Sequence, residues 1–292
     1  MAVLKDRFVH IADLHFWEVV LNPLKLLNKR MLGNANVVLR RRHEFQVHFA
    51  EEYADAVAAL GINTAVLTGD FTSTATEREF EAAQAFTRGL AARGLEVVVM
   101  PGNHDVYTFG SVRRKRFEVC FGDYMPAKGY PARLDLPGGT PLIIVPTVTP
   151  NILSSKGRIT PAQVAASQAL VRDTPDTPVV VAGHYPLLHR THAYTTSSGR
   201  QLRNAASLRA MLAGAERDIL YVAGHVHRFS YVQDPDHARL VHLTTPALFL
   251  HRRKEDIRGA FSEVHVYDDG TFRVFEHINK GTWQRCEAVR VA

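Results

Sequence analysis

The sequence predicts a mixed α/β protein in which two sheets pack together and helices lie outside them. Short runs of Val, Ile and Leu recur along the first two thirds of the chain, helical patterns separate the early runs, and closely spaced strands follow towards the end. Of the 292 residues, 46% are hydrophobic and 22% are charged. These proportions are those of a folded protein and exclude a disordered or fibrous chain.

Six apolar runs are typical of buried strands, and they cover residues 8–12, 64–68, 95–100, 142–145, 179–182 and 219–223. Between the first two runs, Phe49, Tyr53 and Val57 recur at fourfold spacing before Gly61, as in a helix. A second helical pattern begins near residue 76 and ends before Gly94. This β-α-β-α-β order predicts parallel strands joined by crossover helices.

The later part of the chain predicts two more helices and a group of antiparallel hairpins. One helix begins after Thr160, with Pro161 at its first position, and another covers residues 204–212. The closing strands are expected at residues 229–232, 240–243, 260–267 and 271–275, with an Asp-Asp-Gly turn before the last. No repeat or long linker interrupts residues 1–292, so we expect a single domain.

Metal-ligand residue types follow five of the six predicted strands. In open α/β sheets, ligands bind beyond the carboxyl ends of the strands. The residues found there are Asp13, His15, Asp70, Asn103, His104, Asp105, His184, His225 and His227. Asp-x-His and His-x-His spacings place two side chains on one side of an extended segment. The two cysteines, Cys120 and Cys286, form no zinc-binding motif, so His and carboxylates would hold any metal.

Seven of these residues are candidate ligands, which is too many for one tetrahedral ion and suits two ions that share a carboxylate. The ordered motifs DLH, GD, GNHD, GH and GHVH, between residues 13 and 227, resemble the calcineurin-like metallophosphoesterase family. The resemblance implies one ion held by Asp13, His15, Asp70 and His227, and a second held by Asp70, Asn103, His184 and His225. It also implies a four-layer αββα sandwich.

The same resemblance implies hydrolysis of a phosphodiester or pyrophosphate bond by a metal-bridging hydroxide. His104 and Asp105 are the candidate catalytic residues, and we expect His104 to donate a proton to the leaving oxygen or to stabilise it. We expect manganese, while iron, zinc, nickel and cobalt also suit the nitrogen and oxygen donors. The chain lacks the GDxxDR and GNHE motifs of phosphoprotein phosphatases, which disfavours protein phosphatase activity.

Residues 16–43 fit neither the strand nor the helix pattern and are both apolar and basic. Because this insert begins directly after His15, it is placed to form a lid or wall of the substrate cleft, or else a helical cap packed on the core. The insert contains a Leu-Asn-Lys-Arg-x-Leu-Gly-Asn-x-Asn run at residues 27–36. With this run it is similar to the same segment in bacterial metallophosphoesterases that include a type of UDP-2,3-diacylglucosamine pyrophosphatase of lipid A synthesis. That similarity implies a lipid-linked nucleotide substrate.

Other functions remain as alternatives. A cyclic-nucleotide phosphodiesterase would share all five motifs and needs no apolar wall. The pI near 9.4 permits nucleic acid as a partner, but no Arg and Lys stripe interleaved with aromatics favours a nuclease. A non-catalytic scaffold would be expected to have lost ligands, and none is missing. No membrane-spanning run or signal-peptide pattern is evident, so we expect a cytoplasmic protein with possible peripheral contact at the inner face of the membrane through residues 16–43.

Overall fold

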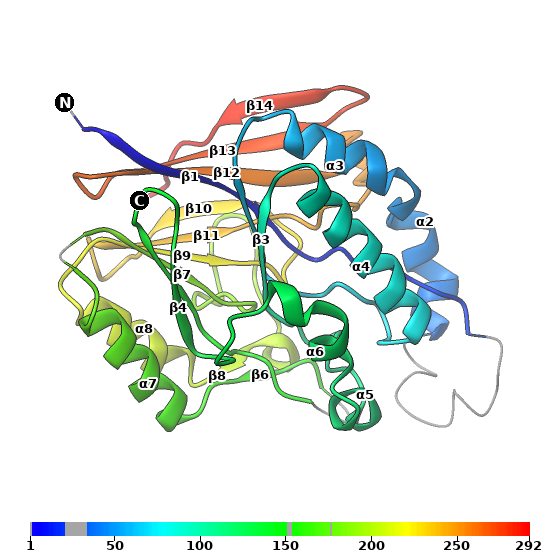
Figure 1. Cartoon of the computed structure of the whole chain (residues 1–292), viewed down its shortest axis with the longest axis horizontal. Coiled ribbons are helices and arrows are strands. Elements are labelled where there is room, and N and C mark those ends of the chain that lie inside the picture. The colour runs from blue at the N-terminus through cyan, green and yellow to red at the C-terminus, as the bar shows by residue number, and fades with distance from the viewer. Residues whose placement is uncertain (1, 21–33, 151–153, 176) are drawn as a thin grey trace.

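Two six-stranded mixed sheets pack face to face, and helices cover their outer faces (Figure 1). The computed structural model describes residues 2–20, 34–150, 154–175 and 177–292. In Figure 1, α3 and α4 lie on one side of the paired sheets and α7 and α8 lie on the other. This arrangement confirms the predicted four-layer αββα sandwich.

The first sheet has the strand order β14-β13-β12-β1-β2-β3. Its strands are β1 (Leu4–Ile11), β2 (Thr64–Leu67), β3 (Glu96–Val99), β12 (Ala260–Tyr267), β13 (Phe272–Asn279) and β14 (Trp283–Glu287). Strands β1, β2 and β3 run parallel, and the strands from β12 to β14 extend the sheet by antiparallel pairing with β1. The carboxyl ends of β1, β2 and β3 therefore meet at one edge.

The second sheet has the order β10-β11-β9-β7-β5-β4. Its strands are β4 (Ala132–Asp135), β5 (Pro141–Ile144), β7 (Val179–Ala182), β9 (Ile219–Ala223), β10 (Ser230–Gln233) and β11 (Leu240–Thr244). Strands β5, β7, β9 and β11 are parallel, while β4 and β10 are antiparallel edges. A separate parallel pair consists of β6 (Gly157–Arg158) and β8 (Leu202–Arg203).

The α-helices are α2 (Arg42–Glu44), α3 (Ala50–Ala58), α4 (Glu77–Ala92), α5 (Phe109–Arg113), α6 (Arg116–Phe121), α7 (Pro161–Arg172) and α8 (Ala205–Ala213). Shorter helical turns are the π-helical turn η2 (Val37–Arg41) and the 3₁₀ turns η3 (Val47–Phe49), η4 (Gly122–Tyr124), η5 (Ser198–Arg200) and η6 (Arg253–Glu255). Thr76 begins α4 and Thr160 begins α7, each through a capping box with the residue three positions on. The start predicted from Thr160 and Pro161 is confirmed.

Successive side chains of each strand point to opposite faces of its sheet, and this explains how the sheets pack against each other and against the helices. Val9 and Ile11 of β1 pack with the residues of α3 and α4, whereas Phe8 packs with residues of the opposite sheet. In the second sheet, Val180 and Ala182 face the first sheet, and Val179 and Val181 pack beneath α7 and α8. Because both faces are buried, these strands are apolar throughout, which is the pattern that identified them in the sequence.

The sequence prediction differs from the structure at several elements. The two predicted hairpins form as β10-β11 and β12-β13, but they belong to different sheets. Strands β4, β6, β8 and β14 were not predicted, because two have only two residues and β14 is a largely exposed edge strand without alternation. No helix among the described residues is both long enough and apolar enough to cross a bilayer.

A buried carboxylate ties the edge strand β14 to the sheet. Glu263 of β12 accepts hydrogen bonds from His265 at 2.6 Å, from His277 at 2.8 Å and from two nitrogens of Arg285 at 2.8 and 3.1 Å. Burial alone would raise the pKa of Glu263, but these hydrogen bonds outweigh it and hold that pKa well below its usual range. Glu263 therefore remains ionised and joins three strands.

We expect Glu263→Gln to lower the free energy of unfolding at pH 7 by about 1.5–3 kcal/mol, the usual contribution of hydrogen bonds to a charged group. Because the pKa of Glu263 is lowered by folding, its contribution is complete above the unfolded value of roughly 4.3 and declines as the pH falls below it. Urea unfolding of both proteins at several pH values measures this. Arg273→Gln, which removes an exposed ion pair with Glu287, is the control. If the difference in unfolding free energy between wild type and Glu263→Gln did not change with pH, the ionised state assigned to Glu263 would be contradicted.

Candidate metal centre

The predicted ligands lie on sharp turns that follow the strands of both sheets. Five of them have left-handed backbones, with φ values of +53° at Asp13, +50° at His15, +55° at Asp70, +68° at His225 and +55° at His227. Each such conformation costs on the order of 1–3 kcal/mol in a residue other than glycine and persists only where its surroundings fix it. The turns direct these side chains to a common point at the strand ends.

The turns after β2 and β3 pack against each other with no space for a side chain. A Cβ atom added to Gly102 would overlap the backbone nitrogen and one carboxylate oxygen of Asp70. Gly69, with φ of +96°, meets the backbone of Gly102 in the same way. Glycine at these positions is therefore required for Asp70 and Asn103 to lie side by side.

Asp105 holds these two turns together. One of its carboxylate oxygens accepts from the backbone N–H groups of Gly102 at 2.8 Å and Phe71 at 3.2 Å, and the other accepts from the N–H of Thr72 at 2.9 Å and from its hydroxyl at 3.0 Å. The side chain is buried. These contacts are those of a positioning residue, because all four donors belong to the turns that carry Asp70 and Asn103.

The first cluster of candidate ligands contains Asp13, His15 and His227, whose ligand atoms lie within 4.8 Å of one another. His15 Nε2 lies 2.9 Å from His227 Nε2 and 3.6 Å from an Asp70 oxygen. His15 Nδ1 lies 3.2 Å from the carbonyl oxygen of Thr72, to which an N–H there can donate. In that tautomer the lone pair of His15 is on Nε2 and points towards the cluster.

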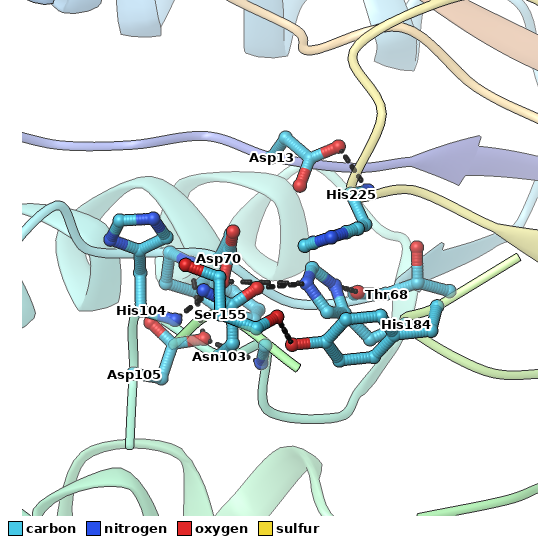
Figure 2. Close-up of polar contacts among 12 residues, drawn as sticks. Asp13, Thr68, Asp70, Asn103, His104, Asp105, Ser155, His184 and His225 are labelled. Atoms are coloured by element: carbon cyan, nitrogen blue, oxygen red, sulfur yellow. Dashed lines mark hydrogen bonds and ion pairs between the residues drawn. The ribbon is translucent and has the colours of Figure 1, made fainter. Parts of the chain in front are cut away.

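The second cluster contains Asp70, His184 and His225, again within 4.8 Å (Figure 2). His184 Nδ1 lies 2.8 Å from the carbonyl oxygen of Thr68, so donation there leaves a lone pair on Nε2. That atom lies 3.1 Å from Asn103 Oδ1 and 3.5 Å from Asp70 Oδ1. A nitrogen lone pair and two oxygens that converge in this way fit a cation.

His225 links the two clusters. Its backbone N–H donates to Asp13 Oδ2 at 2.7 Å (Figure 2). Its Nε2 lies 2.9 Å from the carbonyl oxygen of Arg200. Donation from Nε2 to that carbonyl leaves Nδ1 as the atom with a lone pair. The other oxygen of Asp13, Oδ1, is buried and accepts no hydrogen bond from any described residue. A buried carboxylate oxygen without a donor also fits a metal ion.

The charges of the site support the same conclusion. Burial, followed by repulsion from Asp70, raises the pKa of Asp13 well above its usual range, and burial raises the pKa of Asp70 to about 7. Burial also lowers the pKa of His15 and His225 well below the usual value, so both rings are neutral near pH 7. Clustered carboxylates require cations, and neutral imidazoles can bind them, so the residues present fit a dinuclear divalent metal site.

His104 lies beside the candidate ligands, and its ring and that of His184 lie to either side of Asp70 in Figure 2. Its backbone N–H donates to Asp70 Oδ1 at 2.7 Å, and its Nδ1 lies 2.6 Å from the carbonyl oxygen of Ser73. Arg41 was not predicted to belong to the site, yet its guanidinium lies 3.0 Å from His104 Nε2 and 3.1 Å from His15 Nδ1. No motif distinguishes Arg41 from the arginines on either side of it.

An open cavity of about 690 Å³ leads to the centre. Its inner wall includes Asp70, Asn103, His225 and His227, and the rest of the lining includes residues of the insert and η6 and residues of other loops, such as Ser155 and Arg200. Seven of the described residues around it are basic, namely Arg40, Arg41, Arg200, Arg228, Arg252, Arg253 and Lys254. Apart from Asp70, the acidic residues of the described lining are Glu44 and Glu255. The cavity is therefore strongly cationic.

A family model described as calcineurin-like phosphoesterase matches residues 6–229, which is more than half of the chain. None of the curated proteins matches significantly. A solved structure of a dimetal phosphatase from Danio rerio is similar, with a TM-score of 0.64 and 14% identity over 98% of this chain and 100% of that one.

Two larger proteins share the fold over about half of their own length. A purple acid phosphatase from yellow lupin (Lupinus luteus) has a TM-score of 0.58 and 12% identity, covering 98% of this chain and 54% of that chain. A 5'-nucleotidase from Candida albicans has a TM-score of 0.52 and 13% identity, covering 94% and 51%. At these identities the likeness concerns the fold.

We expect Gly102→Ala to weaken Mn²⁺ binding by about 10- to 100-fold, the usual effect of disturbing groups that orient metal ligands, because the new Cβ displaces Asp70. Titration with Mn²⁺, followed by metal analysis after desalting, measures the effect. Gly122→Ala is the matched control, since a Cβ there has no heavy atom within 4 Å. Equal Mn²⁺ affinity in Gly102→Ala and wild-type protein would argue against this close packing.

Proposed function

Because this chain belongs to the calcineurin-like phosphoesterase family and is a hydrolase of phosphoester bonds, we propose that it cleaves a phosphodiester or pyrophosphate bond in a lipid-linked nucleotide, such as UDP-2,3-diacylglucosamine. The observation that carries the proposal is the position of the metal centre at the inner wall of a cationic cavity. The scissile group would bind at the centre, and the rest of the substrate would occupy the cavity.

The chain's own residues supply two sets of ligands. Asp13, His15, Asp70 and His227 would hold one ion, and Asp70, Asn103, His184 and His225 would hold the other, with Asp70 shared. Two divalent ions, which we propose to be manganese, would supply a hydroxide nucleophile at neutral pH and offset negative charge on the phosphate. The neutral imidazoles and the two buried aspartates leave the loaded site positively charged, and this favours binding of a phosphate anion.

The charge around the cavity favours a pyrophosphate over a singly charged diester. Seven basic residues face two glutamates in the described lining, and both glutamates are already paired, Glu44 with Arg40 at 2.9 Å and Glu255 with Arg252 at 2.9 Å. A single phosphodiester contributes one negative charge. A nucleoside diphosphate linkage adds a second phosphate that the outer basic residues can bind.

The lipid part of the proposal rests on the insert. Leu39 is 80% exposed at the cavity, and Val226 and Leu250 also line it. Residues 37–44 are helical and contribute Leu39 to Arg41 to the wall. Residues 21–33, which include much of the apolar sequence that suggested an acyl-chain or membrane contact, lie outside the described part of the chain. An acyl group at the rim would be held by apolar contacts next to basic residues.

With Mn²⁺, we expect kcat/KM for an acylated UDP-glucosamine to exceed the values for cyclic AMP and bis(p-nitrophenyl) phosphate at least tenfold. The reason is that only the acylated nucleotide contacts both the basic residues and the apolar rim of the cavity. UMP release measures the first reaction. Presenting the substrate in anionic vesicles allows flotation of the same mixture to report peripheral membrane contact.

Asp70→Ala is the inactive control, because Asp70 belongs to both ligand sets. Preferential turnover of cyclic AMP would replace the proposal with a signalling phosphodiesterase. Equal turnover of all three compounds would remove the lipid-linked substrate and leave a general phosphodiesterase. Protein that stays at the bottom of the gradient would contradict the membrane contact alone.

His104 is proposed to act on the leaving oxygen. It lies beside Asp70 and its ring stacks on Tyr107, with centroids 5.3 Å apart and an interplanar angle of 12°. These contacts fix the ring at the metal centre without using it as one of the proposed ligands. A positioned imidazole is suited to proton transfer near neutral pH.

His104→Ala is expected to keep two bound ions and to lose about 10²- to 10⁴-fold in kcat, the usual contribution of a general acid. Metal analysis and steady-state kinetics on one preparation measure both quantities. Because His104 also lies within 4.8 Å of His15 and Asp70, loss of an ion from His104→Ala would instead identify it as a ligand.

A further inference from the structure

Three consecutive arginines lie at the end of the insert, and only the side chain of the middle one is buried at the metal centre. Arg40 is exposed and forms an ion pair with Glu44 at 2.9 Å. Arg42 is exposed and lies 3.0 Å from the ring of His43. Arg41, the last residue of the π-helical turn η2, is only 8% exposed. The helical turn therefore buries one guanidinium at the metal centre and leaves its neighbours in solvent.

The buried guanidinium of Arg41 has no carboxylate partner within ion-pair distance among the described residues. Its polar neighbours are the rings of His15 and His104, and it lies 6.0 Å from the ring centroid of Phe45. Burial lowers the pKa of Arg41, opposed chiefly by the charge of Asp70. A buried cation is costly without an anion in direct contact, so this arrangement favours binding of a further negative group.

The tautomers of the two histidines leave most of the Arg41 N–H donors without an acceptor in the described part of the chain. His15 Nδ1 carries the hydrogen when it donates to Thr72, so it offers no lone pair to Arg41 at 3.1 Å. In the neutral ring, His104 Nδ1 carries the hydrogen and donates to Ser73 at 2.6 Å, so only Nε2 of that neutral form can accept from Arg41. A guanidinium has five N–H donors. One accepting imidazole nitrogen leaves several of these donors without an acceptor among the described residues, and Arg41 lines the cavity.

We propose that Arg41 is a substrate-binding residue whose guanidinium donates to nonbridging oxygens of the scissile phosphate. This inference rests on the proposed function, since it assigns a phosphate ester to the same centre. The planar fork of N–H groups matches two phosphate oxygens, and the anion supplies the charge that the buried cation lacks. The insert then contributes a residue that contacts the reacting group, in addition to forming a wall of the cavity.

A role for Arg41 in placing His15 or His104 is the competing explanation. In that case removal of Arg41 would disturb metal binding first, whereas a phosphate-binding residue affects the anion alone. Arg41→Gln and Arg41→Lys separate the two roles. Arg42→Gln is a matched control, because Arg42 is adjacent, exposed and absent from the described cavity lining.

The experiment is calorimetric titration of inorganic phosphate into the Mn²⁺-loaded protein, with metal analysis and a thermal melt of every variant. We expect all variants to retain two ions and to remain folded. The Kd for phosphate should rise about 10- to 100-fold in Arg41→Gln, the range for a lost charge-assisted hydrogen bond, and by a smaller factor in Arg41→Lys, while Arg42→Gln is unchanged.

An unchanged Kd in Arg41→Gln, or a folded Arg41→Gln protein that has lost an ion, would overturn the inference, as would wild-type protein that binds no phosphate. If Arg41→Gln does not fold, Arg41→Lys decides by the same two measurements. Failure of the proposed function has a different result. A wild-type protein that binds phosphate tightly yet cleaves none of the three test substrates would refute the proposed function, while phosphate binding would still report on Arg41.

Discussion

Compensation of buried charge is the constraint on which this structure depends. Asp13 and Asp70 are removed from solvent at the ends of β1 and β2, among neutral imidazoles that contribute lone pairs but no positive charge. Carboxylates in such a place are stable as anions only beside cations. That requirement explains the convergence of ligand atoms and the strained turns that aim them.

The glycines around the centre show how backbone packing serves this electrostatic arrangement. Asp70 can meet Asn103 and His184 only because the turns after β2 and β3 touch through Gly69 and Gly102. Asp105 then uses its whole hydrogen-bonding capacity to fix those turns. Asp105, the residue that follows His104 in the GNHD motif, thus holds other residues of the site in place. Its contacts distinguish it from His104, whose ring faces the ligands.

Much of the fold was predictable because strands buried on both faces are apolar along their whole length, and ligand types after such strands mark a common edge. Prediction from local sequence patterns fails where the position of a strand or side chain depends on its contacts with other parts of the fold. Strand β14 does not alternate between buried and exposed residues, and it is held by Arg285, which reaches across β13 to Glu263 of β12, 22 residues earlier in the chain. Arg41 could not be distinguished from Arg40 and Arg42, because only the path of the insert decides which of the three turns inward. The sheet to which each closing hairpin belongs is likewise a property of long-range pairing.

The ligands are divided between the two sheets, and this division has a mechanical consequence. Asp13, His15, Asp70 and Asn103 follow strands of the first sheet, whereas His184, His225 and His227 follow strands of the second. Ions bound between these ligands would cross-link the two sheets and oppose any sliding of one sheet over the other. The apolar layer between the sheets, including Phe8 and Leu220, would in turn set the spacing of the ligands. The distance between the two sheets would then affect both the reactivity of the metal centre and the rigidity of the sandwich.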